Sequence, residues 1–395
     1  MKHLLIIFLL FFTINLFSQI QVTSDFEGGN VDVLSIIDST NTITIKPALN
    51  TSTNTTKCWF YFKLFDFDKD SLLTINIKYD RKVMAPEYPV FSYDQKNWTK
   101  IKSKYTYGKK TVSYQFTEDT VYFATGFPYV YSDVISYSNK IAENPNVDTT
   151  TLTISEGGRR VPKYVISNGK DKDLVWIIAR QHAFESMSNF VVEGIIDYIA
   201  SEDSLAVEFR KQASLHVVPM MDVDNVAIGA SGRMQRPIDM NRDWNPESHW
   251  KAVKEVKKEL KETSLENNYR IFIDMHSTFP GATYPIFSYF NMYNGTEKLQ
   301  NIDRYWEIFY EYANISPKKL SETKFTQGNI LADEYSSGIS CEENGIPCFD
   351  NIDFSFTMEC DWNNRPDGEQ WTQETLYQAG RDMGKAICKY ITSDE

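Results

Sequence analysis

The sequence predicts an α/β protein in two parts: an antiparallel β-sandwich, followed by a larger three-layer α/β/α domain in which helices cover both faces of a sheet. Two observations predict this. Up to about residue 125, short runs rich in Val, Ile, Thr, Phe and Tyr alternate with turn-forming clusters. Beyond that point, apolar strand-like runs alternate with helical patterns, which is typical of an α/β sheet. The chain has 395 residues, of which 42% are hydrophobic, and is therefore long enough for two domains.

The first part contains six predicted strands joined by short connections. Clusters such as Asp68-Lys-Asp-Ser mark the turns between them. We expect strands at Thr42–Pro47, Lys57–Phe65, Leu72–Tyr79, Val90–Tyr93, Lys110–Phe116 and Thr120–Ala124. No long helical pattern interrupts them, so an antiparallel sandwich is favoured.

The pattern changes near Gly126-Phe-Pro, where helical spacing first appears. We expect strands at Leu174–Ile178, Ser214–Met221 and Tyr269–Met275, a hairpin over Thr150–Ser167 that turns at Gly157-Gly158, and helices at Tyr131–Asn144, Ser248–Glu262 and Gln373–Tyr390. The helix that ends the chain places its apolar residues on one face, which predicts that it packs on the core.

The N-terminus predicts a secretory signal peptide over residues 1–18. Lys2 precedes an apolar run, Leu4–Phe12, which is well short of the ~20 residues needed to cross a bilayer. A buried N-terminal helix or an uncleaved anchor is the alternative. No other stretch is long and apolar enough to span a membrane, so no stable span is expected after the signal peptide is removed.

The charge pattern argues against nucleic acid and anionic membranes as partners, because the formal net charge is −12 and no block of Lys and Arg stands out. The five cysteines are scattered without CxxC spacing, which excludes a zinc knuckle. A Cys341–Cys348 disulfide is one option that the spacing leaves open. Because five is an odd number, at least one thiol is expected to stay free or to pair outside the chain.

Zinc-ligand residue types follow two of the predicted strands. His182 and Glu185 lie on the polar turn after Leu174–Ile178, and His276 follows the strand at Tyr269–Met275, 91 residues after Glu185. Two donors on a short turn and a third far along the chain are typical of a catalytic zinc site with one position open for water. Taken singly, HxxE occurs by chance on many surface helices, and a histidine at a strand end is more often a satisfied core residue. Of the other histidines after residue 18, His216 lies in an apolar strand and His249 opens a helix, so we expect a structural residue and a surface residue.

A polar loop between these two segments carries three arginines, Arg233, Arg236 and Arg242. The planar guanidinium group binds carboxylates in a bidentate manner, so the loop predicts a site for an anionic group. A polar surface loop is the alternative. Asp239, in the same loop, is placed to accept the Nδ1 proton of a zinc-bound histidine.

The segment Asp353–Cys360 predicts a strand that ends in a carboxylate, Glu359. An edge strand with a solvated glutamate is one interpretation. The other is a general base, which takes a proton from a zinc-bound water and passes it to the leaving amine.

The combined motifs resemble the zinc carboxypeptidases of the funnelin type, most of all the cytosolic-carboxypeptidase branch that includes tubulin deglutamylases. The matching segments are RQHAFES, VVPMMDVDNVAIGASGR, IDMNRDWN, DMHS and FTMEC, together with CWFYFKL, FSYDQKNW and VYFATGFPYVYSD in the first part. The resemblance covers nearly the whole chain after residue 18. It implies a mixed sheet in the catalytic domain and one Zn²⁺ per chain.

The resemblance also implies residue roles. His182, Glu185 and His276 would bind zinc, and Glu359 would be the general base. In the polar loop, Asn241 and Arg242 would hold the substrate's C-terminal carboxylate. Arg233 would polarise the scissile carbonyl and stabilise the oxyanion, a role for which Arg236 is the other candidate. Tyr335, in a later segment, would be the mobile tyrosine that closes over the substrate.

Two departures from the family pattern concern the substrate. Ala183-Phe184 stands where the branch often has Pro-Gly, and Val223-Asp224-Asn225 replaces Pro-Asp-Gly. Neither removes a catalytic atom. The signal peptide argues against a cytosolic, tubulin-like substrate, and the acidic run Cys341-Glu-Glu-Asn-Gly favours a basic terminal residue.

We therefore expect a secreted or periplasmic zinc metallocarboxypeptidase that acts on the C-terminus of a peptide or protein. Its β-sandwich would span residues 19–125 and its catalytic domain 126–395. One alternative is a zinc amidohydrolase acting on cell-wall peptides or small acyl-amino acids. Another is a secreted binding protein with a vestigial zinc site. The sequence leaves the oligomeric state and the terminal side-chain preference open.

Overall fold

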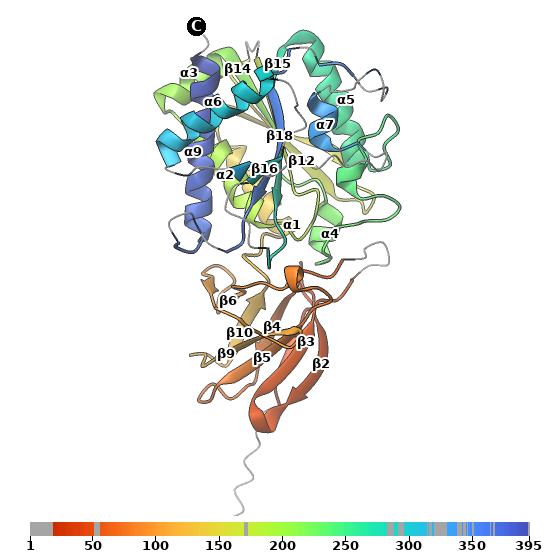
Figure 1. Ribbon diagram of the computed structural model, residues 1–395, viewed down its shortest axis with the longest axis vertical. Helices are drawn as coiled ribbons and strands as arrows, with labels where there is room; N and C mark the ends of the chain where they lie inside the picture. The colour runs from red at the N-terminus through yellow and green to blue at the C-terminus, as the bar shows by residue number, and fades with distance from the viewer. Residues whose placement is uncertain are drawn as a thin grey trace, which may run out of the picture.

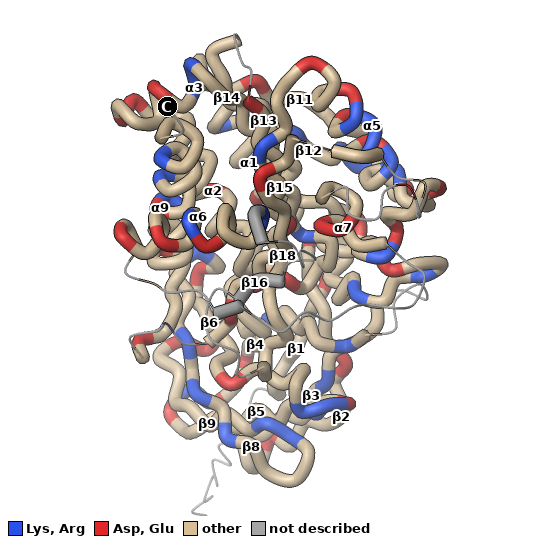
Figure 2. The backbone as a smooth tube through the Cα atoms, turned by 45° about the horizontal axis from the view of Figure 1, so that its top comes forward, with Lys and Arg blue, Asp and Glu red and all other residues tan. Residues whose placement is uncertain are grey.

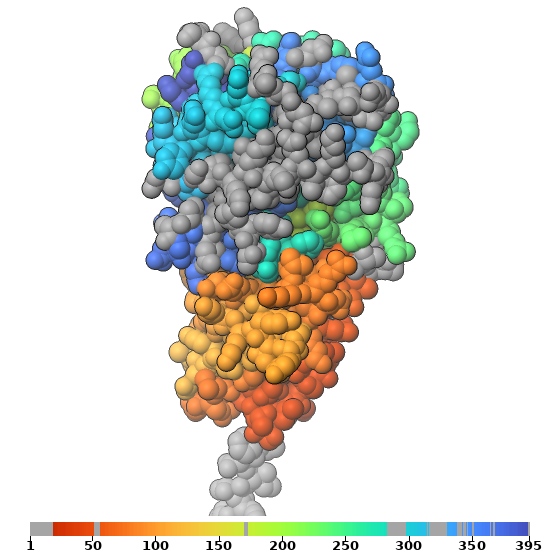
Figure 3. All heavy atoms as spheres, in the orientation of Figure 1, coloured from red at the N-terminus to blue at the C-terminus, as the bar shows by residue number. Residues whose placement is uncertain are grey.

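The computed structural model describes residues 19–393 apart from 51–55, 170–172, 283–287, 291–295, 314, 316–317, 320–329, 338–341, 343–344, 346, 350, 364 and 366–367. The predicted signal peptide, residues 1–18, lies outside the described residues. Figure 1 shows a smaller all-β part stacked end to end on a larger α/β part, and Figure 3 shows the same two parts in contact.

The N-terminal part is a sandwich of two five-stranded sheets, with strand orders β1-β4-β10-β6-β7 and β2-β3-β5-β9-β8. The strands are β1 (Gln21–Thr23), β2 (Asp32–Ile37), β3 (Thr42–Lys46), β4 (Tyr61–Phe65), β5 (Leu73–Lys78), β6 (Val90–Ser92), β7 (Thr99–Lys100), β8 (Lys104–Thr106), β9 (Lys109–Tyr114) and β10 (Thr120–Ala124). All six predicted strands are present. The sandwich departs from the prediction in one pair, because β3 and β5 run parallel.

Alternation along the strands builds the core of the sandwich. In β3 the side chains of Ile43 and Ile45 are fully buried, while those of Thr42 and Thr44, which alternate with them, are half-buried. Three phenylalanine rings also belong to this core: Phe62 lies in β4, Phe60 directly precedes it, and Phe123 lies in β10. Phe60 stacks on Phe123 with 5.6 Å between ring centroids. The first sheet and the second therefore share one apolar layer.

The C-terminal part contains an eight-stranded mixed sheet with the order β11-β12-β14-β13-β15-β18-β16-β17. Its strands are β11 (Val147–Ile154), β12 (Arg160–Ile166), β13 (Asp173–Ala179), β14 (Ala213–Val218), β15 (Asn268–Ser277), β16 (Ser288–Phe290), β17 (Lys318–Lys319) and β18 (Phe354–Cys360). The four central strands, β14, β13, β15 and β18, are parallel. The interpretation of Asp353–Cys360 as an edge strand is excluded, because β18 pairs on both sides.

Helices cover both faces of this sheet, as predicted (Figure 1). They are α1 (Tyr131–Ile141), α2 (Met187–Ile199), α3 (Ser204–Gln212), α4 (Val223–Ala227), α5 (Lys251–Glu266), α6 (Thr296–Ala313), α7 (Ala332–Ser337) and α9 (Gln373–Thr392), with a short 3-10 helix, η3, at Met240–Arg242. The helices α2 and α9 can pack closely because Gly194 and Gly380 have no side chain. A Cβ atom at either position would lie about 2 Å from a backbone carbonyl oxygen of the facing helix. The apolar face predicted for the last helix is buried.

Three smaller predictions also have outcomes. His216 is buried in β14 beside Trp176, as expected of a structural residue. His249 is exposed and lies two residues before α5 begins. Three thiols are free, those of Cys58, Cys360 and Cys388; Cys348 is disulfide-bonded, and Cys341 lies outside the described residues.

The surface charges fit the composition. Figure 2 shows Lys and Arg interspersed with Asp and Glu over both parts of the chain. Within the residues that the structure describes, no helix is long and apolar enough to cross a membrane.

Candidate metal centre

The turn that follows β13 is held by a buried arginine. Arg180 follows β13 in the left-handed region, with φ 61°. Its backbone N–H donates to Met275 O of β15 at 3.3 Å, and its carbonyl accepts from Asp222 N, which lies beyond the end of β14, at 3.1 Å. Its guanidinium donates to Ala183 O from Nε at 2.8 Å and from Nη2 at 2.6 Å, and Nη1 donates to Asn189. Burial lowers the pKa of Arg180 to about 9. This role of Arg180 was not predicted, although the sequence places the residue between the apolar strand and the turn that carries His182 and Glu185.

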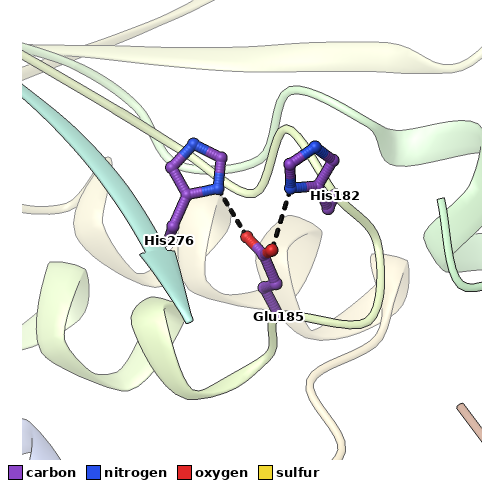
Figure 4. Close-up of side chains that lie close together, drawn as sticks. All are labelled: His182, Glu185 and His276. Carbon is purple, nitrogen blue, oxygen red and sulfur yellow. Dashed lines mark hydrogen bonds and ion pairs between the residues drawn. The ribbon is translucent and has the colours of Figure 1, made fainter. Parts of the chain in front are cut away.

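Three predicted ligands meet at this turn. Nδ1 of His182 lies 2.8 Å from Glu185 Oε1, and Nδ1 of His276 lies 2.7 Å from Glu185 Oε2. The three residues are 1–2% exposed, and one donor atom from each lies within 4.8 Å of the others. Figure 4 shows both imidazole rings turned towards the same carboxylate. The strands β13 and β15 are paired neighbours, so the sheet brings together residues that are 91 positions apart.

The far nitrogen of each imidazole faces a carboxylate. His182 Nε2 lies 3.0 Å from Asp239 Oδ1, and His276 Nε2 lies 2.9 Å from Asp274 Oδ2. A proton on each Nε2 satisfies these contacts and leaves each Nδ1 as a metal donor. The prediction for Asp239 was therefore wrong in its atom, since Asp239 meets Nε2 and not Nδ1.

Asp274 is a second carboxylate that sequence reasoning missed. It lies two residues before His276 on β15 and therefore on the same face of the sheet. Gln181 fixes it further, donating from Nε2 to Asp274 Oδ2 at 2.7 Å, while Gln181 Oε1 accepts from Trp244 Nε1 at 3.0 Å. The sequence feature that could have identified Asp274 is the DxH spacing, an aspartate two residues before the histidine.

The electrostatics of the cluster suit a cation. Burial alone would raise the pKa of Glu185, but the charges and hydrogen bonds of His182 and His276 outweigh it and bring that pKa to about 2. Burial works against protonation of His276, yet Asp274 and Glu185 raise its pKa well above the usual value. Two buried imidazoles, each hydrogen-bonded to a further carboxylate, and an ionised carboxylate form a donor set that suits Zn²⁺.

Glu359 lies beside the cluster. It is the register partner of His276 across the parallel pair β15 and β18. Its Oε2 is buried and has no hydrogen-bond partner among the described residues. Burial, reinforced by the charge of Glu185, raises the pKa of Glu359 to about 7. A carboxyl group with this pKa can both accept and release a proton near neutral pH.

Arg233, one of the three loop arginines, reaches the cluster. Its Nη1 is 3.5 Å from His182 Nδ1 and 3.9 Å from Glu185 Oε1, and its guanidinium lies over the Phe279 ring at 4.8 Å. Arg236 is exposed, and we find no hydrogen bond or ion pair from it to the three ligands in the described part of the chain. The geometry therefore favours Arg233 over Arg236.

Asn241 and Arg242 lie on η3, which Asp239 caps through Asn241 N at 3.1 Å. Asn241 Nδ2 is 3.1 Å from His276 Nε2, and Arg242 Nη1 donates to Asn241 O at 2.7 Å. Burial lowers the pKa of Arg242, while the charge of Asp239 opposes this. Both residues are thus held next to the ligand set.

Tyr335 is placed differently. It lies on α7 and is 3% exposed, with its ring 5.7 Å from that of Trp244 and 6.1 Å from that of Phe349. None of the contacts described for it reaches the metal cluster, so in this conformation it is a core residue. Of the acidic run from Cys341 to Gly345, only Glu342 and Gly345 are described.

Comparison with known proteins agrees with this geometry. Residues 22–125 match the family model of the cytosolic carboxypeptidase N-terminal domain, and residues 134–382 match that of zinc carboxypeptidase. Cytosolic carboxypeptidase 6 of Caenorhabditis elegans is 24% identical over 93% of this chain and 85% of its own. The human protein of the same name is 23% identical over 92% of this chain and 77% of its own.

Solved structures show the same fold over almost the whole chain. A metallo-carboxypeptidase from Burkholderia cenocepacia superposes with a TM-score of 0.80 at 20% identity, covering 95% of this chain and 100% of the other. The metallo-carboxypeptidase from Pseudomonas aeruginosa in complex with (2-guanidinoethylmercapto)succinic acid gives 0.78 at 20% identity, covering 94% and 99%. The ligand set His182, Glu185 and His276 and the match over residues 134–382 lead to one conclusion: the chain belongs to the zinc carboxypeptidase family.

Proposed function

We propose that this protein removes the C-terminal residue of a peptide or protein, with Glu359 as general base and Arg233 as the group that meets the developing oxyanion. The observation that carries the proposal is the pairing of Glu359 with His276: a buried carboxylate oxygen without a described partner lies next to a metal-ligand set. The family membership supports a peptide hydrolase that uses one zinc ion.

When bound by His182, Glu185 and His276, zinc would polarise the scissile carbonyl and acidify a water molecule. Glu359 takes a proton from the attacking water and returns it to the leaving amine, for which a pKa of about 7 is suited. Arg233 offers N–H donors beside the ligands, where negative charge develops on the carbonyl oxygen. Stacking on Phe279 limits the movement of that guanidinium.

The terminal carboxylate would be held by Asn241 and Arg242. Arg242 supplies a planar fork of donors, and Asn241 supplies an amide next to His276. Together they support cleavage at the chain end over cleavage within a chain, since an internal peptide bond offers no carboxylate at this distance.

Two further proposals concern the whole chain. We place the division between the sandwich and the catalytic domain near residue 125, where the first family match ends and before the second begins at residue 134. We also propose export, because Lys2 and the apolar run Leu4–Phe12 have the pattern of a signal peptide, although the relatives that match over most of this chain are named as cytosolic proteins. A processed N-terminus after residue 18 in the exported protein would support this proposal, and an intact Met1 in the cell extract would contradict it.

Release of a terminal amino acid from a peptide library tests the proposed activity. The zinc-loaded protein should release single C-terminal residues, and a chelator should abolish the release. Matched peptides with an amidated C-terminus should be poor substrates. Cleavage of free and amidated peptides at the same rate would contradict the proposal.

A further inference from the structure

The segment that leads into Arg233 is bound by the β-sandwich. Three successive carbonyl groups of residues 227–229 accept hydrogen bonds from it. Gly28 N donates to Ala227 O at 3.0 Å, Asn50 Nδ2 to Ile228 O at 2.8 Å and Asn30 Nδ2 to Gly229 O at 2.6 Å. The donors come from residues about 180 to 200 positions earlier in the chain.

The two backbones are in direct contact at this point. Gly229 has φ 69°, and a Cβ atom there would lie 2.4 Å from Gly29 O. Only glycine leaves room for this approach. The contact is therefore made by backbone atoms, which leaves little room for the two domains to shift relative to each other at this point.

Ser231 is the next link. Its side chain is fully buried, and its Oγ accepts hydrogen bonds from Cys58 N at 3.0 Å and from Trp59 N at 3.2 Å. Its backbone carbonyl accepts from Phe184 N at 3.0 Å. Phe184 lies between the metal ligands His182 and Glu185, so one residue joins the sandwich to the metal-ligand turn.

The residue after Ser231 tightens this link. Gly232 has φ 62°, and a Cβ atom there would lie 2.5 Å from Ala183 N. Arg233 follows directly, and its guanidinium lies over Phe279, whose ring stacks on Phe184 at 5.8 Å and 14°. Two contacts thus set the position of Arg233. The backbone just before it is held through Ser231, and its guanidinium packs on the ring pair Phe279 and Phe184.

The sandwich also supports the aromatic pair from behind. Phe184 stacks on Trp362 at 6.1 Å and 4°, and Trp362 follows β18, the strand of Glu359. Lys100 of β7 donates from Nζ to Trp362 O and, at 3.0 Å, to Asn363 O. The β-sandwich therefore contacts both groups that position Arg233: Ser231 on its backbone side, and Trp362 behind the aromatic pair.

We propose that Ser231 is a positioning residue, through which the β-sandwich holds Arg233 in its place beside the metal ligands. The inference rests on the oxyanion role proposed for Arg233. Loss of the Ser231 hydroxyl would leave the Cys58 and Trp59 amides buried without an acceptor, which favours a shift of the segment. Misplacement of a catalytic group by about 1 Å can cost about a hundredfold in rate.

A double-mutant cycle tests this role. Ser231→Ala, Arg233→Ala and the double variant are compared for kcat, KM, zinc content and Tm with one free-carboxylate peptide. We expect Ser231→Ala to lower kcat about tenfold or more in the wild-type background and less than about twofold in the Arg233→Ala background, at unchanged zinc content. An equal fold-loss in both backgrounds would overturn the inference, because a general loss of stability acts on both alike.

Two further variants keep the test decisive. Ser138→Ala removes another buried hydroxyl, one that bonds Val134 O and Tyr164 in the catalytic domain, and should leave kcat unchanged. If Ser231→Ala does not fold, Asn50→Gly replaces it in the cycle. Asn50 is exposed with φ 56°, so glycine keeps the backbone while removing the amide that binds Ile228 O. A kcat unchanged by Asn50→Gly would then overturn the inference.

The outcomes separate this inference from the proposed function. A wild-type protein that releases no terminal residue, or an Arg233→Ala variant with full kcat, contradicts the proposed function. An active wild type that needs Arg233 but shows additive losses in the cycle contradicts only the role of Ser231.

Discussion

His276 and Glu359 are register partners on the neighbouring parallel strands β15 and β18. The first belongs to the group of residues that could hold a metal ion, and the second has a buried oxygen without a hydrogen-bond partner among the described residues. Paired residues of parallel strands project from the same face of a sheet. The sheet therefore sets the separation between these two side chains, and no loop has to do so.

The carboxylate behind His276 should govern metal affinity. Asp274 accepts from Nε2 of His276 and from Gln181, so Nδ1 is the nitrogen of this ring that faces Glu185. We expect Asp274→Asn to weaken zinc binding about 10–100-fold, measured by competition with a chromogenic chelator. Asp224→Asn, at the ion pair with Arg159, is the control for loss of a carboxylate in the same domain. Wild-type zinc affinity in the Asp274 variant would show that the second carboxylate is dispensable.

Arg242 should distinguish free from amidated chain ends. Its guanidinium lies next to Asn241 and is partly buried, so a substrate carboxylate would bind there with little competition from water. We expect Arg242→Ala to lower kcat/KM about a hundredfold or more for peptides with a free carboxylate and far less for amidated ones. The control is Arg381→Ala on α9, whose guanidinium lies over Tyr198. Equal losses on both substrate types would contradict a role in carboxylate recognition.

Glu193 on α2 should make stability depend on pH. Burial, followed by the charge of Asp197, raises the pKa of Glu193 to about 7 despite the hydrogen bond from Tyr129. A raised carboxyl pKa means that the folded state binds the proton more tightly. The contribution of Glu193 to stability is therefore complete below the unfolded-state pKa of about 4.3 and is lost as the pH rises through about 7.

Glu193→Gln removes this ionisation. We expect the variant to gain stability relative to the wild type as the pH rises from about 5 to about 8, by at most about 3 kcal/mol. Denaturant unfolding at the two pH values measures the gain, and Glu262→Gln on the exposed side of α5 corrects for the change in net charge. A difference between variant and wild type that does not change with pH would contradict the prediction.

The fold and the ligand set could be predicted because their signals are local. The apolar runs that become β13 and β15 are each followed directly by their ligands, and the carboxyl ends of neighbouring parallel strands meet at one edge of the sheet. The strands β1, β2, β7, β8, β16 and β17 were not predicted. β7 has two residues, and β2 is largely exposed, so neither carries the alternation that marks a half-buried strand.

The missed parts of the site depend on contacts between distant segments. The atom that Asp239 meets is decided by the rotation of the His182 ring, and the bonds from Cys58 and Trp59 to Ser231 join residues more than 170 positions apart. No periodicity records such contacts. Tyr335 was predicted from its resemblance to the mobile tyrosine of the family, and such a resemblance says nothing of its packing against Trp244.

The central claim is that Glu359 is the base of a zinc-dependent carboxypeptidase. Glu359→Gln keeps the size of the side chain and leaves His182, Glu185 and His276 untouched. The decisive measurement is single-turnover release of a C-terminal residue by the zinc-loaded wild type and by this variant, with zinc content determined on the same samples. We predict equal zinc content and a loss in rate of about a thousandfold or more, since both proton transfers are removed. A variant that binds zinc and releases the terminal residue at nearly the wild-type rate would contradict the claim.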